Sequence, residues 1–263
     1  MADATDRGAG TATSQDRTRI ALRVTVTVAA IVAVAFAAFA VWALTPYRAD
    51  EAAREAMVSD ALVAVSERPE GIVFEPVGGA STGLVLYPGG RVEAAAYAPL
   101  ARSVAESGYL VVIQPMPFNL AVFGIGRAER ALDAHPGVGE WAVGGHSLGG
   151  AMAAQFVAGE PAGVSGLVLL AAYPAGSTDL SEASLGALTL VGSEDGLVSD
   201  EEIEAGAALL PADARLVVID GGNHAGFGSY GAQRGDGEPA IDADTQLSIS
   251  ADEIATLLGT LSR

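Results

Sequence analysis

The sequence predicts an α/β domain, with helices on both faces of a mostly parallel sheet, preceded by a single N-terminal transmembrane helix. Two observations predict this architecture. Apolar runs of strand length alternate with helical patterns through most of the chain, as in a parallel sheet whose two faces are both covered. Near the N-terminus, the 21 residues 24–44 contain no charged side chain and no proline, and a helix of that length spans a bilayer core of about 30 Å.

The composition excludes several classes of function. The chain of 263 residues carries 14 arginines, no lysine and 32 acidic residues, and its net charge of −18 argues against a nucleic-acid surface. Without lysine there is no side-chain amine for Schiff-base chemistry, and without cysteine there are no disulfides or thiolate nucleophiles. Three histidines leave little room for a multi-histidine metal centre, so neither a metal nor a cofactor is expected.

The charges that flank residues 24–44 predict the topology. Arg17, Arg19 and Arg23 precede the apolar stretch, whereas the arginines just after it are mixed with acidic residues. This bias keeps residues 1–23 in the cytoplasm as a tail and sends the rest of the chain across the cell membrane. An alternative is a cleaved signal peptide with a small-x-small site at residues 38–40, which would leave a secreted domain. Residues 45–59 are expected to form a stalk, and residues 60–263 to form one globular domain.

The elements of that domain can be taken in order. The β-rich stretches 60–67 and 71–77, separated by Arg-Pro-Glu, predict an opening hairpin. Further strands are predicted at residues 83–87, 109–114, 141–144, 166–171, 187–191 and 215–219, and helices at residues 94–106, 127–134, 148–158, 200–210 and 244–261. Because ligands of parallel sheets bind beyond the carboxyl ends of the strands, functional residues are expected in the loops that follow the strands.

A Gly-x-Ser-x-Gly motif occurs twice, in different contexts. Residues 79–83 precede a predicted strand and are interpreted as a turn, which makes Ser81 a structural residue. Residues 145–149 follow the strand at 141–144 and open the helix at 148–158. Small residues suit a sharp strand-to-helix turn, and the helix N-terminus offers N–H groups to developing negative charge. Ser147 is therefore the candidate nucleophile.

A serine hydroxyl needs a base, and the base needs an acid that fixes its tautomer. His224 follows the strand at 215–219, and Asp195 follows the strand at 187–191, with Glu194 as the alternative acid. Of the other two histidines, His135 is interpreted as a solvated loop residue, and His146 as a residue that packs or forms a hydrogen bond. Ser147, Asp195 and His224 are thus predicted to meet at one edge of the sheet.

An oxyanion hole is expected beside Ser147. The Leu148 N–H would supply one donor, and the Pro-Gly-Gly loop after the strand at 83–87 would supply the other, from Gly90 or Arg91. Large side chains near the strand ends are expected to bound the substrate pocket: Met116, Phe118, Tyr173 and Phe227. The acidic stretch 236–244 lacks the spacing of an EF-hand and is interpreted as a solvated loop.

Residues 86–90, 144–150, 192–196 and 221–225 resemble the α/β-hydrolase superfamily, in particular its small lidless bacterial group related to dienelactone hydrolases. The resemblance implies an α/β-hydrolase fold and a carboxylesterase-like serine hydrolase that acts through an acyl-enzyme on a small-molecule ester or similar acyl substrate. The chain order of Ser147, Asp195 and His224 matches that of the superfamily. The chain departs in two places, since dienelactone hydrolases use Cys where it has Ser147, and many esterases carry His-Gly where it has Pro88 and Gly89.

Two other functions are compatible with the same residues. A catalytically silent module that binds a partner in the cell envelope could keep this fold, and an acyltransferase would use the same nucleophile. Residues 172–186, where a lid usually enters in this superfamily, are few, small and polar, which predicts an open pocket. The sequence does not predict an oligomeric state.

Overall fold

The computed structural model describes residues 14–261, and it divides into two compact units between Trp42 and Ala43. Most of helix α1 (Ser14–Ala43) belongs to the first unit, and its residues Arg19–Ala43 are long and apolar enough to cross a membrane. By length and composition this helix is a candidate membrane span. Because α1 begins before residue 24, part of the expected N-terminal tail is helical, and residues 1–13 of that tail lie outside the described residues.

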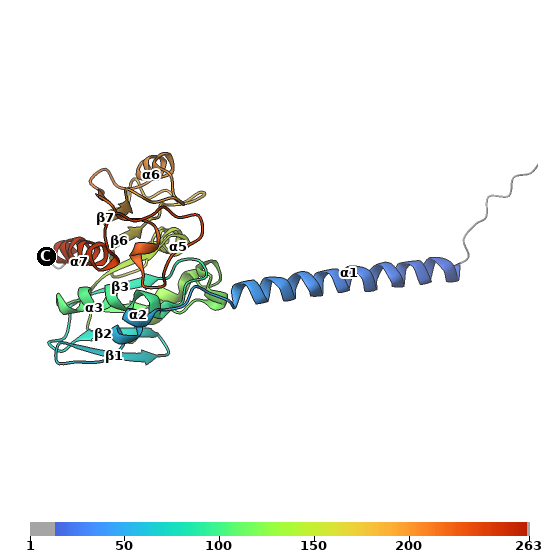
Figure 1. Cartoon of the computed structure of the whole chain (residues 1–263), viewed down its shortest axis with the longest axis horizontal. Coiled ribbons are helices and arrows are strands. Elements are labelled where there is room, and N and C mark those ends of the chain that lie inside the picture. Colours follow the sequence, from blue (N-terminus) through green and yellow to red (C-terminus); the bar gives the residue numbers. More distant parts are fainter. Residues whose placement is uncertain (1–13, 262–263) are drawn as a thin grey trace, which may run out of the picture. The chain divides into compact units, whose positions relative to one another are not determined.

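The second unit is built on one eight-stranded sheet in the order β1-β2-β4-β3-β5-β6-β7-β8 (Figure 1). The strands are β1 (Val63–Arg68), β2 (Gly71–Pro76), β3 (Thr82–Tyr87), β4 (Leu110–Ile113), β5 (Glu140–His146), β6 (Val164–Leu170), β7 (Gly186–Gly192) and β8 (Arg215–Ile219). β2 runs antiparallel to both of its neighbours, and the strands from β4 to β8 pair in parallel. The predicted mostly parallel sheet and its opening hairpin are confirmed.

Helices cover both faces of the sheet, because side chains along the central strands alternate between two apolar clusters. In β3, Leu84 and Leu86 join the cluster under α2 (Glu51–Ala56), α3 (Ala98–Glu106) and α7 (Ala243–Leu261). Val85 and Tyr87 join the cluster under α4 (Ala128–Ala134) and α5 (Leu148–Val157). Figure 1 shows α3 and α7, which contact each other, with α6 (Asp200–Ala207) further along the sheet. The two-residue alternation of a strand thus buries both faces.

The expected stalk is not a separate segment. Residues 43–59 belong to the same compact unit as the sheet, and α2 packs on α3. Ala53 and Ala56 of α2 are buried, and the Arg102 guanidinium of α3 donates hydrogen bonds to the carbonyl oxygens of Ala56 and Val58. Small alanine side chains allow this close helix contact, but a helix of six residues is too short to show a clear apolar periodicity in the sequence.

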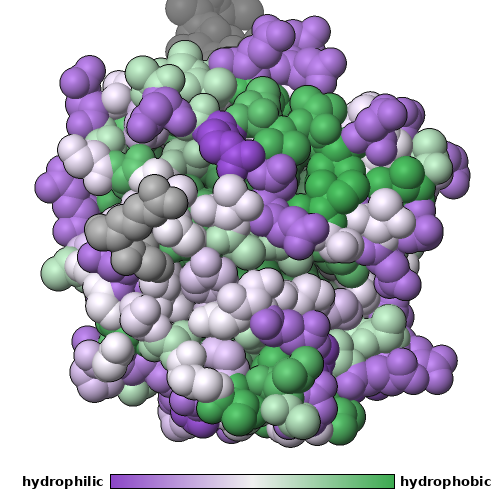
Figure 2. All heavy atoms as spheres, turned by 90° about the vertical axis from the view of Figure 1, so that its left-hand side faces the viewer, coloured by the Kyte–Doolittle hydropathy of each residue, from purple (hydrophilic) through white to green (hydrophobic). Residues whose placement is uncertain are grey.

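The surface of the domain mixes hydrophilic and hydrophobic side chains. On the face drawn in Figure 2, hydrophobic side chains gather in separate patches between hydrophilic ones. Among the exposed large hydrophobic side chains, Val218 lies on the edge strand β8. Phe118, Val122 and Phe123 lie together in the loop that follows β4, which contains the short 3₁₀ turns η2 (Pro117–Asn119), η3 (Ala121–Phe123) and η4 (Ile125–Arg127).

Candidate active site

Ser147 lies on the sharp turn between β5 and α5. Its φ of 51° and ψ of −123° fall in a region that costs a residue with a side chain about 1–3 kcal/mol. The turn is possible because its neighbours are glycines. A Cβ atom at Gly149 would lie 2.3 Å from the carbonyl oxygen of Tyr87, and one at Gly145 would lie 2.5 Å from the carbonyl carbon of Gly149. The backbone of the turn is therefore pressed against the end of β3, with the serine at its apex.

An imidazole and a carboxylate meet in the loops after β8 and β7. Nδ1 of His224 lies 2.9 Å from Oδ2 of Asp195, and both side chains are almost completely buried, at 1% and 4% exposure. The other carboxylate oxygen of Asp195 accepts the N–H groups of Leu197 and Val198. Since the carboxylate accepts, Nδ1 carries the proton, and Nε2 is the ring nitrogen with a lone pair. That Nε2 is buried and has no hydrogen-bond partner among residues 14–261.

Glu194, the alternative acid, has a different environment. Its side chain accepts a hydrogen bond from the hydroxyl of Ser193, and Glu194 is exposed. The geometry pairs His224 with Asp195.

His146 connects the serine turn to the His224 loop. Its ring lies 4.6 Å from the ring of His224, centroid to centroid, and its Nδ1 lies 2.8 Å from the hydroxyl of Tyr97. That hydroxyl also accepts the N–H of Gly89, in the loop after β3. Burial, together with the neighbouring imidazole of His224, holds the pKa of His146 well below its usual value, so the ring is neutral. Because His146 precedes Ser147 directly, this contact brings the serine turn to the imidazole of His224.

Asp236 holds the His224 loop in place, a role that the sequence did not reveal. Its Oδ1 accepts the N–H groups of Gly196, His224 and Gly237, and its Oδ2 accepts the N–H of Ala225. One carboxylate therefore joins the loop that carries Asp195 to the loop that carries His224. The stretch 236–244, interpreted from the sequence as solvated, contributes a half-buried structural group at its first residue.

The loop after β3 distinguishes between the two candidate oxyanion donors. The N–H of Arg91 donates to the carbonyl oxygen of Asn119, at 2.7 Å, and is therefore occupied. The N–H of Gly90 has no backbone partner within the described part of the chain. Gly90 also lies beside Leu148, since a Cβ atom at Gly90 would be 3.4 Å from the Leu148 side chain. Of the two, Gly90 is thus the one whose N–H is available next to the start of α5.

The four side chains expected to bound a pocket do not form one wall. Phe227 is completely buried and packs its ring 6.0 Å from that of His146, so it has no surface to offer a substrate. Met116 is also buried, and the Tyr173 hydroxyl donates to Glu202 of α6. Phe118 is exposed in the loop after β4. The sequence identified apolar residues near strand ends, but which way each side chain turns depends on contacts made by distant elements.

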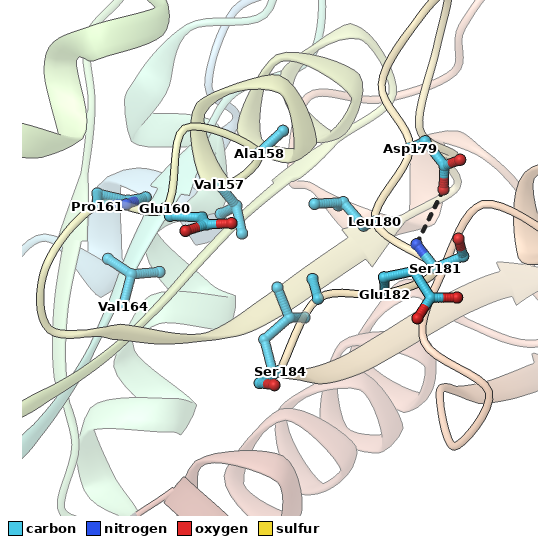
Figure 3. Close-up of a pocket in the computed structure, with 12 residues that line it drawn as sticks. Val157, Ala158, Glu160, Pro161, Val164, Asp179, Leu180, Ser181, Glu182 and Ser184 are labelled. Carbon is cyan, nitrogen blue, oxygen red and sulfur yellow. Dashed lines mark hydrogen bonds between the residues drawn. The ribbon is translucent and has the colours of Figure 1, made fainter.

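A cavity of about 530 Å³ lies at the opposite edge of the sheet, where β6 and β7 begin (Figure 3). Its lining comes from the end of α5, from Glu160 and Pro161, and from the segment between Asp179 and Leu185. Ser81 lies at this edge too, just before β3, and its carbonyl oxygen accepts the N–H of Gly139. Ser81 is exposed at the start of a strand, as its interpretation as a turn residue requires.

The strand order, with a strained serine turn after β5 and a hydrogen-bonded Asp195–His224 pair in the loops after β7 and β8, defines a protein of the α/β-hydrolase class. A family model described as alpha/beta hydrolase family matches residues 83–248, and the chain belongs to that family. Membership of this family supports hydrolase activity. No curated protein matches the sequence.

Several solved structures share the fold at low sequence identity. A predicted CIB-like hydrolase from Thermoplasma acidophilum is 18% identical, with a TM-score of 0.55 over 74% of this chain and 100% of its own. Est1E from Butyrivibrio proteoclasticus, solved with ferulic acid bound, is 11% identical, with a TM-score of 0.55 over 77% of this chain and 98% of its own. Alpha/beta hydrolase domain-containing protein 10 from mouse is 15% identical, with a TM-score of 0.52 over 76% and 100%.

Proposed function

We propose that this protein is a membrane-anchored serine hydrolase that cleaves a carboxylic ester or a similar acyl bond. One observation carries the proposal. The imidazole of His224 is bonded through Nδ1 to Asp195, its buried Nε2 has no hydrogen-bond partner among residues 14–261, and its ring lies 4.6 Å from that of His146, the residue before Ser147 on the strained turn. This arrangement suits a base that must accept a proton from a serine hydroxyl.

In the proposed reaction, Nε2 of His224 takes the hydroxyl proton as Oγ of Ser147 attacks the acyl carbon. The negatively charged oxygen of the tetrahedral intermediate receives hydrogen bonds from the N–H groups of Leu148 and Gly90. Each such donor typically lowers the barrier by about 3–4 kcal/mol. The imidazolium then protonates the leaving alcohol as the acyl-enzyme forms, and water, deprotonated by the same nitrogen, releases the acid.

Asp195 and His146 support His224 in this proposal. Asp195 keeps the proton on Nδ1 and stabilises the imidazolium that forms in each half-reaction. His146 stays neutral and packs beside the imidazole, so it adds no positive charge next to the one that develops there. The resemblance to the group of dienelactone hydrolases supports a small-molecule acyl substrate, with Ser147 in place of that group's cysteine.

The proposed location rests on the candidate membrane span and its flanking charges. Arg17, Arg19 and Arg23 precede the apolar residues 24–44, whereas the arginines just after that stretch are mixed with acidic residues, which favours a cytoplasmic N-terminus and a hydrolase domain outside the cytoplasm. Exposed large apolar side chains occur along this helix from Ile20 to Trp42, as a lipid-facing helix requires.

The test is covalent labelling of the full chain in detergent by a fluorophosphonate probe, together with hydrolysis of p-nitrophenyl esters. We expect Ser147→Ala to abolish both labelling and hydrolysis, and the matched change Ser81→Ala to leave both close to wild type. Labelling that survives in Ser147→Ala would refute the assignment of the nucleophile. A folded wild-type chain that neither labels nor hydrolyses any ester would favour the catalytically silent module. Transfer of the acyl group to an added alcohol in preference to water would identify an acyltransferase.

A further inference from the structure

The loop after β4 exposes an apolar group of side chains. Phe118, Val122 and Phe123 are 40%, 43% and 53% exposed. The two phenyl rings contact each other edge to face, with centroids 5.7 Å apart. Grouped aromatic and aliphatic side chains of this kind are costly in water and are typical of a surface that meets another apolar phase.

Two arginines lie at the rim of this group, although the chain as a whole is strongly acidic. Arg127 and Arg130 line a depression of about 550 Å³ together with Val122, Phe123 and one acidic residue, Glu129, so the charged side chains of this depression carry a net positive charge. The Arg127 guanidinium is held by a hydrogen bond to the carbonyl oxygen of Pro115, and Arg130 is exposed. Burial, together with the positive charge of Arg130, lowers the pKa of Arg127, and both side chains line the same depression. Arginines beside exposed apolar side chains match the interface of a bilayer, where headgroup phosphates overlie acyl chains.

The same loop binds the residue at which the candidate membrane span ends. The side-chain amide of Asn119 donates a hydrogen bond, 3.1 Å long, to the carbonyl oxygen of Ala43. Ala43 is the last residue of the candidate span and the first residue of the compact domain. The loop that carries Phe118 is therefore hydrogen-bonded to the residue that directly follows the first unit in the sequence.

We propose that residues 117–130, here called the docking loop, lie on the outer surface of the bilayer that holds the span. Phe118, Val122 and Phe123 enter the interfacial region, and Arg127 and Arg130 bind the phosphates of anionic lipid headgroups. The occupant of this surface is the lipid of the protein's own membrane, because the span ends at the loop itself. The inference rests on the proposed anchoring of the chain.

Docking would also define the class of substrate, if the proposed hydrolase function holds. The carbonyl oxygen of Asn119, in the docking loop, accepts the N–H of Arg91, the residue after the proposed oxyanion donor Gly90. Leu120 lies next to Gly90 and Leu148, since a Cβ atom at Gly90 would be 3.9 Å from the Leu120 side chain. The mouth of the site therefore adjoins the membrane surface, and its substrates are acyl esters held in that surface.

The absence of cysteine allows a direct test on the full chain. Val122→Cys carries a nitroxide label on the docking loop, and Val218→Cys, at a position 58% exposed on edge strand β8, is the control. Both proteins are reconstituted in vesicles of phosphatidylcholine and phosphatidylglycerol, and power-saturation EPR compares the access of oxygen and of a water-soluble nickel chelate to each label. We expect the label at 122 to be reached preferentially by oxygen and the label at 218 by the chelate. Equal access of the chelate to both labels would overturn the proposal.

A second measurement separates docking from catalysis. Val122→Glu combined with Phe123→Glu should lower hydrolysis of a vesicle-borne ester at least tenfold relative to a water-soluble short-chain ester. An unchanged ratio would refute membrane delivery of substrate. If Ser147→Ala were to remain active while the label at 122 stays lipid-accessible, the proposed catalytic function would fail and the docking surface would stand.

Discussion

The change Asp195→Asn tests whether Asp195 fixes the tautomer of His224, because the two carboxylate oxygens of Asp195 have different hydrogen-bond partners. In the wild type, Oδ1 of Asp195 accepts two N–H groups, from Leu197 at 2.8 Å and from Val198 at 2.9 Å, while Oδ2 faces Nδ1 of His224. An asparagine amide has one oxygen and one NH₂ group. The two backbone donors will hold the amide oxygen at the Oδ1 position, so the NH₂ group must face His224. Nδ1 then becomes an acceptor, and the proton moves to Nε2, which can no longer take the proton of Ser147.

The size of the effect follows from the same geometry. Turning the amide so that its oxygen faces His224 would break two hydrogen bonds worth about 1 kcal/mol each and would place NH₂ against two backbone N–H donors. The productive tautomer is therefore a minor species. A wrong tautomer in the Ser-His-Asp enzymes lowers kcat by about 10⁴-fold, which corresponds to roughly 5.4 kcal/mol in the barrier. Stability should change little, because the two backbone hydrogen bonds survive.

The assay is the hydrolysis of a p-nitrophenyl ester, with urea unfolding measured on the same preparations. Glu194→Gln is the matched control, since it makes the same chemical change one residue earlier on an exposed side chain. We expect near wild-type kcat for Glu194→Gln. A larger loss of kcat in Glu194→Gln than in Asp195→Asn would show that the acid is misassigned by one residue.

Three further predictions follow from other features. Asp236→Ala leaves four backbone N–H groups without their acceptor, and the loosened loops misplace the imidazole of His224. This change should lower kcat by about 10- to 100-fold with little change in KM. The control Glu238→Ala, at an exposed neighbouring residue, should leave kcat unchanged, and an equal loss of kcat in both variants would refute the positioning role of Asp236. Because the pKa of His146 is lowered on folding, the unfolded chain binds a proton that the folded chain does not, so stability is lost as the pH falls below 6.5. Urea unfolding between pH 7.5 and pH 5.5 should show a smaller acid destabilisation in His146→Gln than in the wild type, and identical pH dependence in both would contradict the proposed neutral state. Protease added to sealed, right-side-out membrane vesicles should digest the domain, whereas complete protection would reverse the proposed topology.

Much of the fold could be predicted because its signals are local. Each buried strand is a short apolar run, and each long helix has its own periodicity, so the strands and helices fall near their predicted positions. The segment around α2 could not be predicted, because its six residues become a domain element only through contact with α3 and the guanidinium of Arg102. Residues 45–59, which the sequence predicted as a stalk, are therefore part of the compact domain.

The candidate site shows the same division. The positions of Ser147, Asp195 and His224 follow from strand ends and glycine-rich loops, which are visible in the chain order. The choice between Gly90 and Arg91 required knowledge of Asn119, whose carbonyl oxygen occupies the Arg91 N–H from a loop 28 positions away. Asp236 accepts four backbone N–H groups, from Gly196, from His224 and Ala225, and from Gly237. These donors come together only in the folded chain, so no spacing of residues in the sequence predicts this role.

At Ser147 the backbone conformation lowers the stability of the folded protein, whereas the proposed reaction needs the serine hydroxyl at that position. Its conformation is one that glycine adopts without strain, so replacement by glycine would relax the turn while removing the hydroxyl. Engineering this protein for thermal tolerance by selecting for folded material alone would therefore favour inactive variants at position 147. A screen that requires turnover in every round would keep the serine, and the extra stability would then have to come from other positions, such as the contacts between α2 and α3.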